Sequence, residues 1–401
     1  MTAIRDPLWN TIRVEPFALE LVDAPAFQRL RYVRQLGLAH LVYPGASHSR
    51  FEHALGAYHL ARVALGALSE QGHLTTVAPD EQAIVRAALL LHDIGHYPFS
   101  HALEEIGIPH HEDLARPLIL GGAVGDIVRA HLGADAPERI LSMIRGDSTS
   151  PLAGLVSGSI DLDKIEYLKR DALMCGVPYG EIDVDRLLNA LIVVDDPVRG
   201  RAVIGVNDKA LSALESLLFA KYQMYRNVYW HHAVRSATAM YKRIVEDALA
   251  SGALDMSKLV AFTDEGLIAE LDRKAPTPLL AGLKRRALWK RAAECPAADL
   301  GDRDLEWLAT DRARTRALED DLARRHGLKP GDVLVDFPAK TQMLGLELPV
   351  RLRNGSVVSL TMEGLAGAVN LPRLADEFYR SARWLRIFAR ERVAIELSAV
   401  Q

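Results

Sequence analysis

Apolar residues recur at intervals of three and four along most of this chain. Two clear examples run from Glu81 to Leu91 and from Lys209 to Phe219. This spacing gathers apolar side chains on one face of a helix, which can then pack against a core. The pattern therefore predicts a mainly α-helical protein.

Segments typical of β-strands are few and short. They lie at residues 11–14, 202–206, 333–337, 348–352 and 357–360. Asn354 and Gly355 separate the last two and predict a hairpin turn, because both residue types tolerate positive φ. A helix is expected at residues 371–381. We therefore expect a helical core that carries a small α+β appendage in its C-terminal region.

The expected domain boundary falls after residue 255. Residues 1–255 form the first predicted domain, and residues 256–401 hold a charged helical segment and the α+β region. Within this second part, residues 264–328 are expected to be helical, with dense charge at 284–291 and 311–316. Such runs usually form a solvated helix surface, and this is our interpretation here.

Composition excludes several classes of protein. Over 401 residues, 49% hydrophobic and 25% charged positions are typical of a globular protein. The net charge of −4 argues against extensive binding of nucleic acid. Two cysteines, Cys175 and Cys295, are too few for a disulfide framework. The N-terminus lacks the apolar stretch of a signal peptide, and no apolar run reaches the ~18 residues that span a bilayer. We expect a soluble, cytoplasmic protein without a membrane partner.

Histidines cluster in one part of the chain. Of the 14 histidines, five lie between His92 and His111. The first of them forms a His92-Asp93 pair at the end of an apolar helix that Gly95 and Pro98 should terminate. Imidazole and carboxylate groups presented together suit a divalent cation. A His-Asp pair alone is more often an ordinary surface pair, so further motifs must support a metal site.

Two other segments supply such motifs. Residues 49–56 predict a helix that presents His53 on its inner face. Residues 161–171 place Asp163, Tyr167 and Asp171 at intervals of four, on one helical stripe. Taken alone, this second segment reads as a salt-bridged surface helix. An aromatic residue between two acids on one stripe favours a buried site instead.

The order of these motifs resembles one known family. Residues 49–53 read Ser-Arg-Phe-Glu-His and residues 91–101 read Leu-His-Asp-Ile-Gly-His-Tyr-Pro-Phe-Ser-His, and both precede the Asp163 segment. This arrangement is similar to that of the HD-domain deoxynucleoside triphosphate triphosphohydrolases, which include bacterial dNTPases and a vertebrate enzyme with an added sterile-alpha-motif domain. The likeness extends to residues 27–31, 35–37, 43–48 and 222–229, and more weakly to 333–340. It covers nearly the whole chain.

The resemblance implies one divalent metal ion in each active site. Its ligands would be His53, His92, Asp93 and Asp163. Asp161 competes with Asp163 for the last place, but Asp163 is followed by lysine and precedes Tyr167 by four residues, as in the family. Nitrogen and oxygen ligands do not distinguish iron, manganese, magnesium, cobalt, nickel and zinc. A further Mg²⁺ ion could accompany the nucleotide.

The same resemblance assigns catalytic and substrate-binding residues. His111 occupies the family's catalytic histidine position, and His96, His101 and Glu104 would orient it or contact phosphate. Lys221 stands where relatives often have arginine, so a compact ammonium replaces a guanidinium group that can donate two hydrogen bonds side by side. The residues that would bind phosphate, sugar and base are Gln35, Leu36, Arg50, Lys164, Tyr167, Asp171, Lys221 and Tyr229.

Some relatives bind an activating nucleotide at a second site between subunits. Asp23, Gln28 and Arg31 match the residues used there. However, Arg5 replaces a common asparagine, and the segment that follows departs from the family pattern. Allosteric activation and assembly into a homodimer or homotetramer are therefore hypotheses from the resemblance.

The leading interpretation is metal-dependent hydrolysis of a deoxynucleoside triphosphate (dNTP) to deoxynucleoside and inorganic triphosphate. A second enzymatic hypothesis keeps the metal site but assigns another phosphoester, such as a nucleoside monophosphate or a cyclic nucleotide. A third belongs to another class, a nucleotide sensor without catalysis. The presence of all four candidate ligands and of His111 argues against this third hypothesis.

Overall fold

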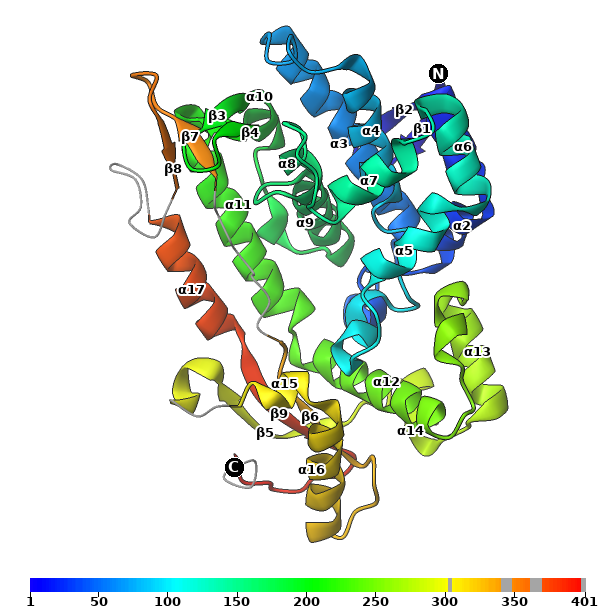
Figure 1. Cartoon of the computed structure of the whole chain (residues 1–401). Coiled ribbons are helices and arrows are strands. Elements are labelled where there is room, and N and C mark those ends of the chain that lie inside the picture. Colours follow the sequence, from blue (N-terminus) through cyan, green and yellow to red (C-terminus); the bar gives the residue numbers. More distant parts are fainter. Residues whose placement is uncertain (302–304, 340–347, 361–369, 398–401) are drawn as a thin grey trace.

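The computed structural model describes residues 1–301, 305–339, 348–360 and 370–397 (Figure 1). The predicted helical stretch 264–328 includes residues 302–304, and the weaker resemblance at 333–340 ends on Lys340; these positions lie outside the described residues. Among the described residues, no helix is long and apolar enough to cross a membrane.

Helices make up most of the structure, as the hydrophobic periodicity predicts. Their bounds are α1 (Pro16–Asp23), α2 (Pro25–Gln28), α3 (Arg50–Glu70), α4 (Pro79–Leu91), α5 (His111–Leu120), α6 (Gly122–Leu132), α7 (Ala136–Ile144), α8 (Gly154–Ser157), α9 (Leu162–Cys175), α10 (Val184–Asn189), α11 (Leu211–Met224), α12 (His232–Ala250), α13 (Asp264–Lys274), α14 (Pro278–Lys284), α15 (Trp307–Thr310), α16 (Arg312–Arg325) and α17 (Leu371–Ala382). Short helical turns of tighter or wider pitch are η1 (Arg29–Tyr32), η2 (Gly37–Leu41), η3 (Ser100–Ile106), η4 (Pro178–Gly180), η5 (Asp208–Ala210), η6 (Tyr225–Tyr229), η7 (Met256–Ala261) and η8 (Ala297–Leu300).

The helices that carry the histidine motifs pack together in the first half of the chain (Figure 1). Helix α3 contacts α4 and α9, and α4 contacts α7. Ser49 and Glu52 form a reciprocal capping box at the start of α3, which fixes where that helix begins. Helix α4 ends at Leu91, immediately before His92. Local sequence signals thus place both motifs at defined ends of buried helices.

Three small sheets accompany the helices within the described residues. Strands β1 (Thr2–Asp6) and β2 (Asn10–Val14) form a hairpin, and β5 (Lys290–Pro296), β9 (Trp384–Ala389) and β6 (Val333–Asp336) form a second, antiparallel sheet. The third sheet has the order β3 (Leu191–Asp196), β4 (Arg201–Asn207), β7 (Pro349–Arg351) and β8 (Val357–Ser359). The helical core with a small α+β region is confirmed, and so is the predicted β7–β8 hairpin.

The prediction for residues 264–328 is wrong in part. Helix α14 ends at Lys284, and residues 290–296 form strand β5 instead of a helix. This strand pairs with β9, almost a hundred residues further along the chain. Strands β1, β3 and β9 were also not predicted. Pairing between segments far apart in the chain decides β5 and β9, whereas β1 and β3 pair with the next strands along the chain, β2 and β4.

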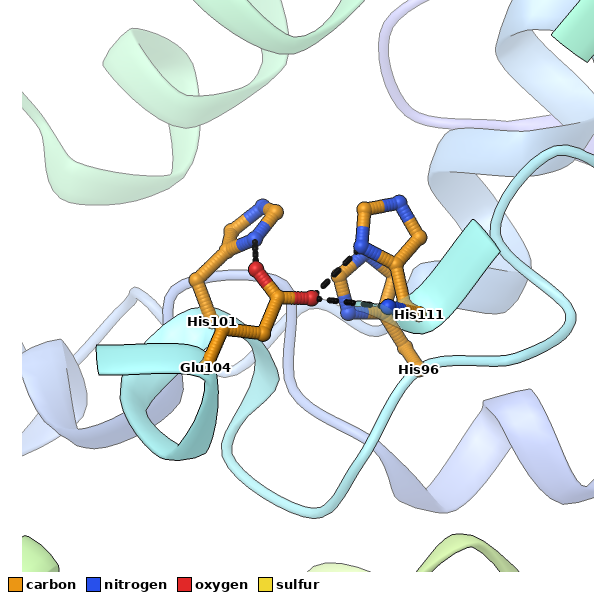
Figure 2. A group of neighbouring side chains, drawn as sticks. All are labelled: His96, His101, Glu104 and His111. Atoms are coloured by element: carbon orange, nitrogen blue, oxygen red, sulfur yellow. Dashed lines mark hydrogen bonds and ion pairs between the residues drawn. The ribbon is translucent and has the colours of Figure 1, made fainter. Parts of the chain in front are cut away.

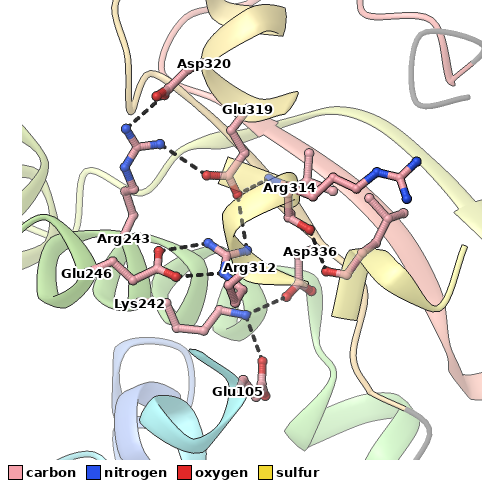
Figure 3. Close-up of polar contacts among 12 residues, drawn as sticks. Glu105, Lys242, Arg243, Glu246, Arg312, Arg314, Glu319, Asp320 and Asp336 are labelled. Carbon is pink, nitrogen blue, oxygen red and sulfur yellow. Dashed lines mark hydrogen bonds and ion pairs between the residues drawn. The ribbon is translucent and has the colours of Figure 1, made fainter. Parts of the chain in front are cut away.

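The charged residues at 284–291 are exposed, as predicted, but those of α16 are solvated only in part, which corrects the prediction for that helix. The Arg312 side chain is only 11% exposed and forms ion pairs with Glu246 of α12 and Glu319 of its own helix. Arg243 of α12 pairs with Glu319 and Asp320 in return (Figure 3). These charges therefore join α16 to α12 and serve as internal contacts.

The predicted boundary after residue 255 stays a prediction. Strand β7, from the C-terminal region, pairs with β4 of the first region in parallel. Helix α17 lies beside α11 (Figure 1). The two predicted parts therefore share a sheet and pack against each other along α11 and α12.

Candidate metal centre and nucleotide pocket

Four side chains, from α3, from the turn that follows α4 and from α9, converge at one point. Nε2 of His53 lies 3.2 Å from Nε2 of His92 and 2.9 Å from Oδ1 of Asp163. Nε2 of His92 lies 3.4 Å from oxygens of both Asp93 and Asp163. When two donor atoms each lie about 2.1 Å from one ion and the two bonds meet at a right angle, the donor atoms are about 3 Å apart. His53, His92 and Asp93 lie close enough together to hold one divalent cation, and Asp163 lies beside both imidazoles.

Each histidine is oriented by a hydrogen bond on its other ring nitrogen. Nδ1 of His53 lies 2.6 Å from Oε2 of Glu166, and Nδ1 of His92 lies 2.8 Å from the carbonyl oxygen of Leu89. These hydrogen bonds leave each Nε2 atom unprotonated, with its lone pair facing the same point. Sequence reasoning missed Glu166, although its place one turn before Arg170 on α9 marks a buried ion pair.

The electrostatic potential at this point is negative. Burial acts to lower the pKa of His53, but hydrogen bonds with Asp163 and Glu166 outweigh it and raise that pKa to about 10. Burial opposes ionisation of Asp93, yet the Arg50 guanidinium holds its pKa well below the usual range. Carboxylates that stay ionised and favour a proton on a neighbouring imidazole equally favour a metal cation.

The geometry favours Asp163 over Asp161 as the fourth ligand. Asp161 caps α9, accepting a hydrogen bond from the backbone N–H of Lys164, and its other oxygen pairs with the Lys164 ammonium. Only Asp163 has an oxygen beside both imidazoles. Lys164 also donates to the carbonyl oxygen of Gly158, 3.0 Å away, so its ammonium is engaged locally.

A second histidine cluster adjoins the first and is joined to it by His96, whose Nε2 lies 3.1 Å from Oδ1 of Asp93. Glu104 lies between His101 and His111, and each of its oxygens contacts one Nδ1, at 2.9 and 2.6 Å (Figure 2). Burial lowers the pKa of His111 to about 4, although Glu104 acts in the opposite direction. His111 is therefore neutral at pH 7, with Nδ1–H donated to Glu104 and Nε2 left as a proton acceptor.

The backbone at Gly95 allows this cluster to form. A Cβ atom at this position would lie 2.1 Å from the carbonyl oxygen of His111, at the start of α5. Without a side chain at Gly95, the start of α5 can approach the His92-Asp93 turn. His111 then stacks on His96, with ring centroids 3.8 Å apart. The close approach of α5 therefore explains why position 95 of the motif is a glycine.

A cavity of about 540 Å³ is lined by His101 and Glu104 of the second cluster and by Arg50, whereas none of the four candidate metal ligands lines it. Eight of the predicted site residues line it: Gln35, Leu36, Arg50, His101, Glu104, Tyr167, Asp171 and Tyr229. Aromatic residues that were not predicted, Phe99, Tyr225 and Trp230, complete its apolar wall. The amide oxygen of Gln35 is buried and has no hydrogen-bond partner among the described residues. This volume and mixed lining are typical of a small-molecule site.

Arg50 connects the cavity to the metal centre. Its Nη1 lies 2.6 Å from Oδ2 of Asp93, and its Nε donates to Oγ of Ser100 at 2.9 Å. Phe99 and Ser100 both have positive φ, 58° and 62°, and the buried carboxylate of Asp264 accepts from the backbone N–H of Phe99 at 2.7 Å. Two consecutive non-glycine residues with positive φ are strained, and both line the cavity.

Lys221 does not line the cavity but lies close to Lys164 and to Asp161 and Asp163. Burial lowers its pKa to about 8, and the nearby Lys164 charge acts in the same direction. Only 6% of this residue is exposed. A buried ammonium near the metal centre is suited to an anionic ligand.

The residues matched to an activator site gather elsewhere. Gln28 accepts a hydrogen bond from Nε of Arg31 at 2.8 Å and donates one to the carbonyl oxygen of Val22 at 2.7 Å. The Arg31 guanidinium covers the ring of Phe51 at 3.5 Å, and Asp23 is exposed at the end of α1. The three residues thus lie on neighbouring short elements outside the cavity lining, and an activating role remains a hypothesis.

Comparison with known protein families matches two regions of the chain. A model of the HD domain matches residues 50–162, and one of the HD associated region matches residues 182–366. An uncharacterised protein of Methanocaldococcus jannaschii is 36% identical over 291 residues, which are 72% of this chain and 59% of that protein. The human deoxynucleoside triphosphate triphosphohydrolase SAMHD1 is 30% identical over 273 residues, 58% of this chain and 42% of the human protein. The chain spans about half the length of the curated relatives it matches.

Solved structures extend the likeness to nearly the whole fold. A hypothetical protein from Aquifex aeolicus is 27% identical, with a TM-score of 0.74 over 97% of this chain and 96% of that one. A phosphohydrolase from Bacteroides thetaiotaomicron has the same fold, with a TM-score of 0.74 at 22% identity over 98% and 100% of the two chains. The motif order, the two adjoining matches and these relatives agree, and this chain belongs to the HD-domain family.

Proposed function

We propose that this protein is a metal-dependent phosphohydrolase that cleaves dNTPs to deoxynucleoside and inorganic triphosphate. The observation that carries the proposal is the convergence of His53, His92, Asp93 and Asp163 beside a cavity of about 540 Å³. A divalent ion held by these four groups would act as a Lewis acid toward a phosphate oxygen. The relatives named as dNTP triphosphohydrolases support this choice of substrate.

The chain's own residues suit the chemistry of this reaction. Water attacks the α-phosphorus, the bond from phosphorus to the 5′ oxygen breaks, and that oxygen takes up a proton. His111 presents a neutral Nε2 that can accept the proton of water, because Glu104 holds its Nδ1–H. Arg50 and Lys221 supply positive charge for the triphosphate. His96 and His101 complete the polar wall around His111.

The cavity lining suits a deoxynucleoside. Tyr167 and Asp171 would reach the 3′-hydroxyl, and Gln35 with Leu36 would crowd the 2′ carbon and disfavour ribonucleotides. Tyr229 offers an aromatic face to the sugar or base. Assembly into dimers or tetramers and activation by a nucleotide belong to the same proposal, supported by the likeness to SAMHD1.

Product analysis tests the proposal. The protein, loaded in turn with each candidate metal, is incubated with each dNTP and NTP, and the products are separated by chromatography. Inorganic triphosphate and deoxynucleoside in equal amounts are expected from dNTPs. Release of orthophosphate, or turnover confined to monophosphates or cyclic nucleotides, would instead favour another HD phosphohydrolase activity. The His92→Ala/Asp93→Ala double variant is the control and should be inactive.

A further inference from the structure

One buried histidine that the proposed mechanism does not use contacts the sugar end of the pocket. His48 lies in the loop before α3, and its side chain is fully buried. Its Nε2 stands 2.8 Å from Oδ1 of Asp171. Its carbonyl oxygen accepts a hydrogen bond from the backbone N–H of Gln35 at 3.0 Å. His48 therefore contacts two of the residues that line the pocket.

Asp171 is held from two sides. Nε2–H of His48 donates to Oδ1, and the hydroxyl of Tyr229 donates to Oδ2 at 2.7 Å. The Tyr229 ring is itself held edge-on by Tyr225, with centroids 5.1 Å apart. Each carboxylate oxygen has two lone pairs, so one on each oxygen remains for a ligand. Two donors on opposite oxygens lock the carboxylate in one orientation.

The chemistry of His48 suits a positioning role. Nδ1 of His48 is buried and has no hydrogen-bond partner among the described residues. A proton on that nitrogen would be unsatisfied, so the neutral form with its proton on Nε2 fits the site best. A neutral donor orients Asp171 without cancelling its negative charge. The carboxylate then remains a strong acceptor for a hydroxyl group.

We propose that His48 is a positioning residue that fixes Asp171 to recognise the 3′-hydroxyl of the substrate. This inference rests on the proposed function, because it assigns the sugar end of the same site. It makes His48 a determinant of specificity for nucleotides with a free 3′-hydroxyl. The residue acts through Asp171 and does not touch the substrate.

The test compares a dNTP with the matching 2′,3′-dideoxynucleoside triphosphate, which lacks only the 3′-hydroxyl. A hydrogen bond to a charged acceptor is expected to give the wild type a preference of about tenfold or more in kcat/KM. His48→Phe keeps a ring but removes the donor, and should reduce the preference to about twofold or less. His48→Gln keeps an N–H at similar reach and should restore most of it.

A second variant guards against misfolding of the first. The side chain introduced by His48→Asn is polar and small, so it keeps the site hydrated but is too short to reach Asp171. This variant should lose the preference for the dNTP in the same way. Bound metal and thermal unfolding are measured for each variant, and neither should follow the change in preference. A preference that is unchanged in both His48→Phe and His48→Asn would overturn the inference and leave the proposed function standing. Absence of any dNTP turnover by the wild type would overturn both.

Discussion

Gly56 of α3 makes room for the carboxylate that orients His53. A Cβ atom at this position would lie 1.9 Å from Oε1 of Glu166 and 2.8 Å from Nη2 of Arg170. Contacts this short cannot exist, so Gly56→Ala would push the Glu166 carboxylate away by more than 1 Å. The 2.6 Å contact between Glu166 and Nδ1 of His53 would then be lost.

Gly66 offers a matched control in the same helix. It is exposed, and nothing lies within 4 Å of a Cβ atom built there. Replacing glycine by alanine inside a helix stabilises the helix by about 1 kcal/mol. Gly66→Ala should therefore raise the free energy of unfolding by roughly that amount. Any different result for Gly56→Ala reports the environment of the residue, because the chemical change is the same.

Two effects of Gly56→Ala have opposite sign. The gain of about 1 kcal/mol in helix propensity also applies at this position. Displacing the Glu166 carboxylate disrupts its buried contacts with Arg170 and His53 and costs about 3–5 kcal/mol, although Arg170 keeps its ion pair with Asp6. The net loss in the free energy of unfolding should be about 2–4 kcal/mol. Loss of the group that orients a metal ligand should also weaken metal binding by about 10–100-fold.

Unfolding of the metal-free variants in urea measures their free energy of unfolding. Competition for metal with a chromogenic chelator gives the affinity, and it does not depend on knowing the substrate. Gly56→Ala should be less stable than Gly66→Ala and bind metal more weakly. If Gly56→Ala were as stable as Gly66→Ala and bound metal as tightly as the wild type, the role given to Glu166 would be wrong.

Three further predictions concern the outer parts of the site. Trp9→Phe removes an indole N–H that lies 3.0 Å from Oε1 of Glu166. Chelator competition should show a metal affinity reduced by about fivefold, the equivalent of ~1 kcal/mol. An unchanged affinity would contradict a link between the N-terminal hairpin and the metal. Glu104→Gln should lower kcat by about 10-fold or more, because His111 loses the carboxylate that holds its Nδ1–H. The amount of bound metal should not change. A fall in metal content would instead place Glu104 in the metal centre. Lys221 is cationic below its pKa of about 8, so kcat/KM should fall as pH rises through 8, whereas the stability contribution of this group rises between pH 8 and the unfolded pKa near 10.5. Lys221→Arg stays charged, and a pH profile that keeps the same fall in this variant would exclude Lys221 as its cause.

Sequence patterns were sufficient for the helical core, because helices form from contacts between residues close in the chain. The periodicity at 81–91 and 209–219 corresponds to α4 and α11. The capping residues of α3 and the break after His92 are equally local. The strand at 290–296 could not be predicted in this way, since its partner β9 lies almost a hundred residues away.

The motifs and their order pointed to the residues of the metal centre. They did not specify Glu166 or His48, whose roles depend on which distant side chains they meet. The same holds for Arg312, which the charge pattern suggested was solvated but which α12 buries. Linear sequence records residue type and local spacing, and these determined the helices and the candidate ligands. Burial and the partner of each charge arise only when helices from distant segments pack together, so the tertiary structure alone decided how those ligands are oriented.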